Sequence, residues 1–332
     1  MKGRAEVSKW LLEGNQPSIR YLTLTELLNR SETDSDVEAA RERIPITGWA
    51  KDILAKQNPA GYWVDGTSLY RPKYVATNWM LLILSDLGLT KEEPRVRRAS
   101  ELWMKRFAAK DGGFDSSSKG SPKYGHLCIT GNTARALVKF GYSDHPRVER
   151  AFEWFVKSQA ELGGWSCWNY GSHPKGRTLD SWEPLSAFAV YPRQKWTRGM
   201  KAAVEKGAEF FLERELHRQG GPYEPWYRFH YPVHYYYDLL VGLDFMTALG
   251  YSSDKRLTFG LSMLKKKMRP DGRWNLDSIN PDPESPQGKW DLEHPKRATT
   301  PFALEEAGKP SKMVTLTALK VLNRVDSGMP GR

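Results

Sequence analysis

Four side chains that could carry acid–base chemistry stand where apolar segments of helical spacing begin. They are Asp180, Glu183, His234 and Asp238. Two carboxyl groups whose surroundings separate their pKa values can serve as general acid and general base. An aspartate at such a position can equally cap the helix that follows it. These residue types therefore allow a catalytic and a structural interpretation.

Nitrogen and sulfur ligands of the kind that zinc prefers are present as well. His126, Cys128, Cys167 and His173 form the candidate set. Their spacing matches no standard zinc finger, and the alternative is that Cys128 is a small buried residue and His173 a loop residue. The chain has two cysteines in all, which excludes a disulfide framework. Zinc is thus the one cofactor that the sequence suggests.

One segment is unusually rich in aromatic and cationic side chains. Residues 226–238 read Trp-Tyr-Arg-Phe-His-Tyr-Pro-Val-His-Tyr-Tyr-Tyr-Asp. Such a composition is uncommon in a loop that only connects helices, although aromatic rings also pack helices together. The rings could stack on a ligand, and Arg228 could bind an anionic head group. The residues that we predict to bind a ligand are Asn78, Trp79, His126, Asn132, Trp182, Trp226, Arg228, His230, Tyr235, Tyr237 and Lys312.

The elements that must position these residues form a repeat. Blocks of glycine and an aromatic residue recur with first glycines at 61, 112, 163, 220 and 272, at intervals of 51, 51, 57 and 52 residues. Apolar residues between the blocks follow helical spacing, so each unit reads as loop, helix, turn and helix. First helices are expected near 74–87, 127–140, 179–190, 235–249 and 311–323, and second helices near 95–108, 145–159, 198–215 and 254–268.

Helical hairpins repeated in this way must bury their apolar faces on one another. Open solenoids usually have shorter repeats, of roughly 33–47 residues, so the pitch favours a closed ring. We therefore predict an all-α fold, an α/α toroid of about six hairpins with an inner and an outer ring of helices. Residues 1–56 would pack on the ring or complete it, residues 57–325 would form the toroid, and residues 326–332 a disordered tail, all in one domain.

Two of the blocks resemble the Gln-x3-Gly-x-Trp motif of squalene-type terpenoid cyclases. Segments 57–63 and 159–165 match it in full, and 268–274 lacks only the glutamine. The resemblance implies the α/α toroid superfamily, which also includes protein prenyltransferase β subunits and complement-like thioester domains. It implies a ligand site in the central cavity, on the rim where the inner helices begin. The motif is structural in that family, so it implies a fold and not an activity.

The motifs that would assign a reaction are incomplete. Prenyltransferase β subunits bind zinc through an Asp-x-Cys pair and a histidine of the next repeat. Asp180 and His234 match that pattern, whereas Trp182 stands at the place of the cysteine. Indole cannot replace a thiolate ligand. The Asp-x-Asp-Asp cluster with which cyclases of this kind protonate an alkene is also absent from the sequence.

Charge and apolar runs narrow the class of partner. The formal net charge of +11 is scattered, which favours anionic ligands without predicting nucleic-acid binding. No apolar run follows Met1, and no stretch reaches the roughly 18 apolar residues that span a bilayer, so a cytoplasmic protein without a membrane span is expected.

The leading hypothesis is a transferase-like or cyclase-like enzyme, or a degenerate relative of one. It would hold a small apolar or anionic-headed, isoprenoid-like ligand. One alternative is a carbohydrate-active toroid, a glycosidase or lyase, in which Glu183 and Asp238 face each other across an open cleft. Another is a non-catalytic interaction scaffold with a filled centre. A helical protein partner would fit the likeness to prenyltransferase β subunits.

Overall fold

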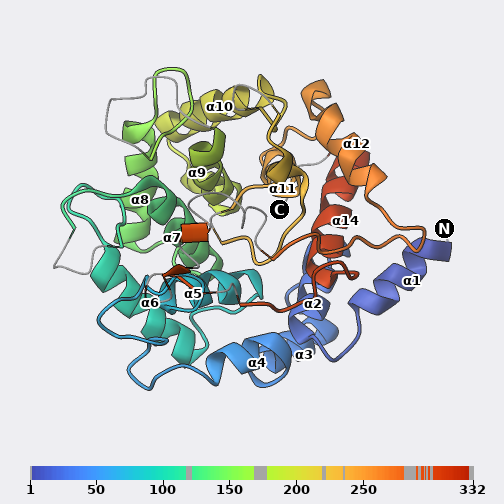
Figure 1. Cartoon of the computed structure of the whole chain (residues 1–332), viewed down its shortest axis with the longest axis horizontal. Helices are drawn as coiled ribbons and strands as arrows, with labels where there is room; N and C mark the ends of the chain where they lie inside the picture. Colours follow the sequence, from blue (N-terminus) through green and yellow to red (C-terminus); the bar gives the residue numbers. More distant parts are fainter. Residues whose placement is uncertain are drawn as a thin grey trace.

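Helices arranged in a ring form the inside of the molecule (Figure 1). The computed structural model describes residues 2–116, 122–167, 178–218, 222–234, 236–279, 289–290, 293–294, 296, 298–299 and 302–328. The inner elements are α2 (Pro17–Leu22), the π-helix η1 (Thr23–Leu27), α5 (Thr77–Asp86), α7 (Leu127–Lys139), α9 (Thr178–Val190), α11 (Leu239–Ala248) and α14 (Lys312–Ser327). From α5 to α14 each inner helix contacts the next, and α14 also contacts α2 and η1, which closes the ring.

A second layer of helices surrounds the inner ring (Figure 1). Its members α6, α8, α10 and α12 each pack on the inner helix that precedes them in the chain. The outer helices are α1 (Lys2–Leu11), α3 (Ser35–Arg43), α4 (Gly48–Leu54), α6 (Pro94–Phe107), α8 (Pro146–Ser158), α10 (Arg198–Leu212) and α12 (Thr258–Lys266). Short helical turns join them at η2 (Ile44–Ile46), η3 (Arg193–Lys195), η4 (Glu224–Tyr227) and η5 (Lys255–Leu257). The predicted all-α fold, an α/α toroid, is confirmed.

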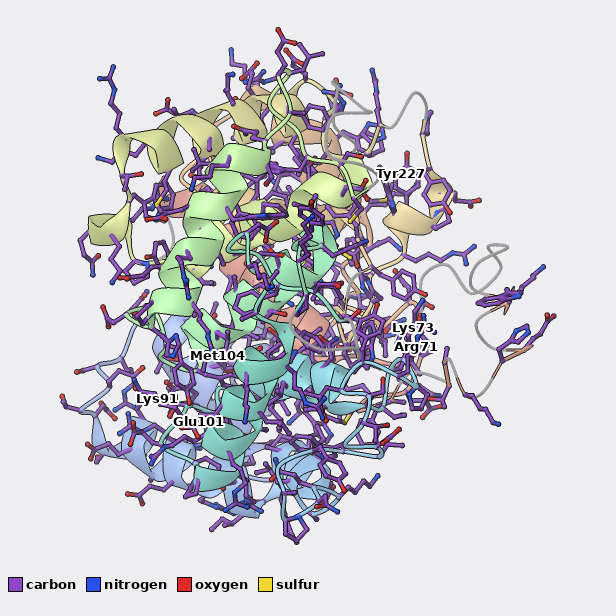
Figure 2. The ribbon with its side chains drawn as sticks, turned by 90° about the vertical axis from the view of Figure 1, so that its left-hand side faces the viewer. Arg71, Lys73, Lys91, Glu101, Met104 and Tyr227 are labelled. Atoms are coloured by element: carbon purple, nitrogen blue, oxygen red, sulfur yellow. The ribbon has the colours of Figure 1, made fainter. Side chains whose placement is uncertain are left out.

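The outer helices form because their sequences are amphipathic and several of them have a side chain that caps the N-terminus. α6 begins with Pro94, whose missing N–H costs nothing in a first turn, and the Glu93 carboxylate accepts the amide hydrogen of Arg95. Glu101 is exposed whereas Met104 is buried against the core, on the side of the molecule seen in Figure 2. Helices of this kind pack one stripe inward and leave the other stripe to water.

The inner helices are apolar nearly all round because both of their faces are covered. Every residue of α5 is buried. α7 and α9 approach most closely at Gly131, where an added Cβ would lie 2.4 Å from the Cβ of Glu183. A side chain larger than hydrogen at that position would push the two helices apart. Among the described residues, extended segments form isolated bridges, such as Ala108 with Phe114, and no named strand.

The glycine-aromatic blocks are corners that tie an inner helix to the preceding outer helix. In the second complete motif, the amide N–H of Trp165 donates to the Ser181 hydroxyl (2.7 Å) and its indole N–H donates to the Phe155 carbonyl (3.0 Å). The Gln159 side-chain amide donates to the carbonyls of Gly163 and Ala203, at 2.7 Å each. Equivalent amide-to-hydroxyl bonds join Trp63 to Thr77, Phe114 to Thr130 and Trp274 to Thr315.

The boundaries differ from the expected ones where a side chain caps the helix. α11 begins at Leu239 rather than near 235, because the Asp238 carboxylate accepts the Val241 amide hydrogen and starts the helix there. α14 continues to Ser327, past the expected end of the toroid. In the part of the chain that is described, no helix is long and apolar enough to cross a bilayer.

The corner geometry yields a test at Gly163. Its φ is +92°, and an added Cβ would lie 2.5 Å from the Lys206 carbonyl oxygen, so Gly163→Ala combines backbone strain with a clash against backbone. We expect it to lower the free energy of unfolding by about 3 kcal/mol. Gly308→Ala is the matched control, since φ is +81° and nothing lies within 4 Å of the added Cβ. It should cost about 1 kcal/mol. Urea unfolding followed by circular dichroism measures both; equal losses would contradict the packed corner.

Candidate functional site

A cavity of about 1120 Å³ occupies the centre of the ring. On α5, α7 and α9 it is lined by residues of the last turns, and not by the expected rim where these helices begin. η1, the segment before α11, and both the first and the later turns of α11 and α14 complete the lining. The lining residues used below are Glu26, Asp86, Arg135, Lys139, Ala189, His230, Tyr231, Val233, Asp238, Leu240, Val241, Asp244, Phe245, Leu316, Lys320 and Arg324.

Part of the cavity wall that α11 and α14 form is apolar. Leu240 and Phe245 of α11 are buried at the lining, as is Leu316 of α14. The segment before α11 adds Tyr231 and Val233. Tyr231 is 4 % exposed, and its hydroxyl has no hydrogen-bond partner among the described residues. This wall could contact the apolar body of a ligand and offer it a single hydroxyl.

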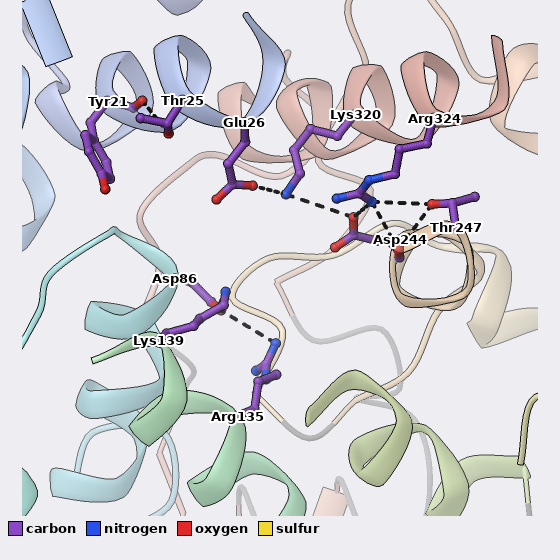
Figure 3. Close-up of polar contacts among 10 residues, drawn as sticks. All are labelled: Tyr21, Thr25, Glu26, Asp86, Arg135, Lys139, Asp244, Thr247, Lys320 and Arg324. Carbon is purple, nitrogen blue, oxygen red and sulfur yellow. Dashed lines mark hydrogen bonds and ion pairs between the residues drawn. The ribbon is translucent and has the colours of Figure 1, made fainter. Parts of the chain in front are cut away.

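A first charged group lies on α5 and α7 (Figure 3). The Asp86 carboxylate is 2.7 Å from Lys139 Nζ and 3.8 Å from Arg135 Nη1. Burial alone would raise the pKa of Asp86, but the two cations outweigh it and hold that pKa below its usual value. Asp86 is therefore an anion that balances the positive charges of Arg135 and Lys139 on α7, and it is a poor proton donor.

A second charged group lies across the cavity on η1, α11 and α14 (Figure 3). Lys320 pairs with Glu26, and Arg324 Nη1 is 2.7 Å from the Asp244 carboxylate. Burial would raise the pKa of Asp244, but Lys320 and Arg324 lower it to about 2. Charges that leave water are retained in proteins when they are paired in this way. These ion pairs also join α14 to both of its neighbours, η1 and α11.

Arg135 is a cation at the cavity whose hydrogen-bond donors are not all used by the described residues. Its side chain is 9 % exposed and lines the cavity. Nε and Nη2 are buried and have no hydrogen-bond partner among the described residues. A buried guanidinium with unused donors is costly, and an anionic oxygen can satisfy it through two parallel bonds. The arrangement can therefore bind an anionic or strongly polar group.

The predicted catalytic carboxylates do not form an acid–base pair across a cleft. Asp238 lines the cavity, but its Oδ2 accepts hydrogen bonds from the His230 backbone amide (2.9 Å) and Nδ1 (2.5 Å), and its Oδ1 caps α11. Glu183 is 2 % exposed and does not line the cavity. Burial, with Cys167 and Asp180 nearby, raises the pKa of Glu183 well above its usual value. The two carboxylates are not both at the cavity: Asp238 caps α11, and Glu183 packs between α7 and α9.

The zinc arrangement of prenyltransferase β subunits does not fit this chain. His234 is 1 % exposed and its ring lies 5.4 Å from that of Tyr74 and 5.3 Å from that of Trp79. Burial, with a smaller contribution from His230, lowers the pKa of His234 to about 3. Trp182 is fully buried where a thiolate ligand would be needed. Asp180 instead accepts the Cys167 amide hydrogen at 3.1 Å. His234, predicted as a catalytic residue, is thus buried among aromatic rings outside the cavity lining.

Most of the predicted ligand-binding aromatic residues pack against one another. Trp226 meets the ring of Tyr237 edge-on at 5.1 Å, and Trp182 lies 6.5 Å from the same ring. The Tyr237 hydroxyl donates to the Leu216 carbonyl, and the indole N–H of Trp79 donates to the Tyr70 carbonyl. These rings form core, so their predicted contact with a ligand in the open cavity is corrected. His230 does line the cavity, held by Asp238.

The remaining predicted ligand residues lie elsewhere. Asn78 and Asn132 are buried outside the cavity lining, and Asn132 Nδ2 donates to the Cys128 carbonyl. Lys312 is 7 % exposed and bonds the Trp10 carbonyl and the Glu13 carboxylate, so it joins α14 to the N-terminal segment instead of binding a head group. Arg228 is exposed and does not line the cavity. Tyr235 and His173 lie outside the described residues.

Three of the predicted metal ligands converge. The ligand atoms of His126, Cys128 and Cys167 all lie within 4.8 Å of one another. The Sγ atoms of Cys128 and Cys167 are 3.4 Å and 3.8 Å from His126 Nδ1. A hydrogen bond with Cys167 raises the pKa of His126. The neighbouring Cys128 thiol and burial raise the pKa of Cys167 well above its usual range. The cluster lies outside the cavity lining.

The charged cavity residues were not predicted, because the prediction considered the first turns of the inner helices and these residues lie in later turns. A usable signal was present: Arg135 and Asp244 are charged residues inside otherwise apolar helices. A charge on a buried helix is expensive unless it is paired or faces a solvent-filled space. Its presence in the sequence therefore indicates a cavity or a buried ion pair.

Comparison with known proteins adds information on the fold. No protein-family model and no curated protein matches the sequence. Similar solved structures include the type II terpene cyclase MstE from Scytonema without ligand (TM-score 0.47, 15 % identity, covering 95 % of this chain and 89 % of that one). They also include an MstE variant with its substrate geranylgeranyl dihydroxybenzoate (0.47, 14 %, 95 % and 88 %) and a protein from Actinoplanes (0.47, 17 %, 93 % and 90 %).

The depressed pKa of Asp244 predicts an acid-dependent stability. The folded chain favours the anion, so its stabilising effect is present above the ordinary pKa of 3.8 and is lost as pH falls toward about 2. Asp244→Asn should lower the free energy of unfolding at neutral pH by about 1 kcal/mol, a modest value because a third of the side chain is exposed. The difference from the unsubstituted chain should shrink as pH falls through this window.

Unfolding by urea at pH values between about 7 and about 2 measures this difference. Asp52→Asn is the control, since Asp52 is exposed on α4 and has no ion pair among the described residues. It should change stability little at any pH. A constant deficit of Asp244→Asn down to the lowest pH would show that the ion pair with Arg324 does not stabilise the ring.

Proposed function

We propose that this toroid binds an amphipathic, isoprenoid-like small molecule in its central cavity, with the polar or anionic end at Arg135. The observation that carries the proposal is the guanidinium of Arg135, which lines a cavity with a partly apolar wall and has two nitrogens without a hydrogen-bond partner among the described residues. A ligand with an anionic head and an apolar body satisfies both features at once.

The size of the cavity supports a ligand of this class. Small-molecule sites have volumes of about 300–1000 Å³, and the cavity here, at about 1120 Å³, accommodates such a molecule. The scaffold hypothesis required a filled centre, and the centre of this ring is hollow. Binding inside the ring is therefore favoured over recognition of a protein on its outer surface.

The positions of the charged side chains set the expected orientation of the ligand in the cavity. Arg135 and Lys139 lie together on α7, while Leu240, Phe245 and Leu316 lie on α11 and α14. An anionic head at α7 would complete the hydrogen bonds of Arg135, and the chain of the ligand would run along the apolar wall. Lys320 and Arg324 are already paired with Glu26 and Asp244, so they are weaker anchors.

The carboxylates at the cavity are unsuited to starting a cyclisation by protonating an alkene. Such an acid must carry its proton, and neighbouring cations lower the pKa of Asp86 and of Asp244. The oxygens of Asp238 are engaged with His230 and with the start of α11. The proposal is accordingly one of binding. The same occupancy of Asp238, with Glu183 buried away from the cavity, weighs against the carbohydrate-active alternative.

Two probes separate the head from the body of the ligand: farnesyl diphosphate and its alcohol, farnesol. We expect farnesyl diphosphate to bind the unsubstituted chain, measured by calorimetry and by a rise in Tm with ligand concentration. Arg135→Gln should weaken it at least tenfold, because a charge-assisted hydrogen bond contributes about 1.5–3 kcal/mol. Farnesol should bind Arg135→Gln as well as it binds the unsubstituted chain.

Arg228→Gln is the matched control, since Arg228 is exposed and outside the cavity lining. It should leave both affinities unchanged. Ala189→Phe, which adds a ring to the α9 wall, should weaken both probes and gives a second test should Arg135→Gln fail to fold. An effect of Arg228→Gln with none of Arg135→Gln, or a Tm raised by an oligosaccharide and by neither prenyl compound, would overturn the proposal.

A further inference from the structure

A group of metal-ligating side chains lies at the beginning of two neighbouring inner helices. His126 precedes the first residue of α7, Cys128 is in its first turn, and Cys167 lies in the corner before α9. Two separate parts of the chain, about 40 residues apart in sequence, thus bring two thiols and an imidazole within 4.8 Å. Both cysteines are free thiols. Nothing in the proposed binding site uses this group.

The distances fit a single tetrahedral ion. Zinc binds sulfur at about 2.3 Å and nitrogen at about 2.0–2.1 Å, which places tetrahedral S and N ligands about 3.6 Å apart. The two observed Sγ-to-Nδ1 distances, 3.4 Å and 3.8 Å, lie on either side of that value. A disulfide would instead need its sulfurs about 2.0 Å apart. Small movements of the side chains would bring all three ligand atoms into the coordination sphere of one ion.

The backbone holds the three residues in place. The His126 amide donates to the Phe114 carbonyl at 2.7 Å, and the Cys128 amide donates to Cys167 Sγ at 3.4 Å. The Cys167 amide donates to the Asp180 carboxylate at 3.1 Å. Such supports fix the ligands before the ion arrives, which lowers the cost of binding. His126 is exposed and both cysteines are partly exposed, so an ion can reach the group from solvent.

We propose that His126, Cys128 and Cys167 bind one zinc ion and leave its fourth position to water or another small ligand. Two thiolates balance the charge of Zn²⁺, and three protein ligands with an open fourth position are typical of zinc sites that act on a bound molecule. The thiols release their protons to solvent on binding. Trp182 and His234 are not part of this site, and Asp180 contributes to it by accepting the Cys167 amide hydrogen.

The site is also separate from the central cavity. Cys128 lies seven residues before Arg135 on α7, which corresponds to about 10 Å along the helix. The cavity opens near the end of α7 and the cysteine cluster lies at its beginning. Zinc binding therefore does not depend on which ligand the cavity takes.

The test uses the full chain, purified with a reductant, stripped of metal and titrated with zinc against a competing chelator. We expect one zinc per chain. His126→Ala, Cys128→Ser and Cys167→Ser should each weaken zinc at least tenfold. His294→Ala is the matched control, because His294 is exposed and remote in sequence from the cluster. It should bind zinc as the unsubstituted chain does. Circular dichroism verifies that each variant is folded.

Two further measurements use the unsubstituted chain and need no substitution of a metal-binding residue. Cobalt in place of zinc should give thiolate-to-metal charge-transfer absorption, and bound zinc should slow the alkylation of both cysteines by iodoacetamide. Failure of the reduced chain to bind zinc, or equal binding by the Cys128→Ser/Cys167→Ser double variant, would overturn the proposal. So would cysteines that form a disulfide in air and show no protection by zinc, since they would then be a redox pair only.

Discussion

The fold depends on one repeated hydrogen bond, from the backbone amide of a corner aromatic residue to a hydroxyl in the first turn of the next inner helix. It joins Trp63 to Thr77, Phe114 to Thr130, Trp165 to Ser181 and Trp274 to Thr315. At the three tryptophans the indole N–H also donates to a carbonyl ten residues earlier. Each corner thereby fixes the start of one helix against the end of another through hydrogen bonds to backbone groups of the turn. Repetition of the same angle bends the hairpins into a ring.

This use of polar groups explains why the cavity opens where it does. At the beginnings of the inner helices, hydroxyl and carboxylate side chains are consumed by corners and caps, as Ser181 and Asp238 are. At the other end, the last turns bring Asp86, Arg135 and Lys139 to face the centre. Charged side chains resist burial, so they line a polar space and pair with side chains of the neighbouring inner elements.

α7 is the helix that links the two chemical features. Its first turn carries Cys128 beside Cys167, and its last turns carry Arg135 and Lys139 at the cavity. Gly131 lies between them and lets α9 approach closely enough for Glu183 to pack against the helix.

The sequence alone determined the ring, since glycine-aromatic corners at a nearly constant interval and helical apolar spacing are local properties of the chain. It also supplied the types of the metal ligands, because sulfur and imidazole are scarce enough to be noticed. It did not determine which polar residues face the hollow: Asp180, Glu183, His234 and Asp238 look alike in sequence whether they cap, pack or react. Tertiary structure decided that Arg135 and Asp86 meet at the cavity, and that His126 and Cys167 meet at a corner. These contacts join residues dozens of positions apart, and only the closure of the ring sets the distance between them.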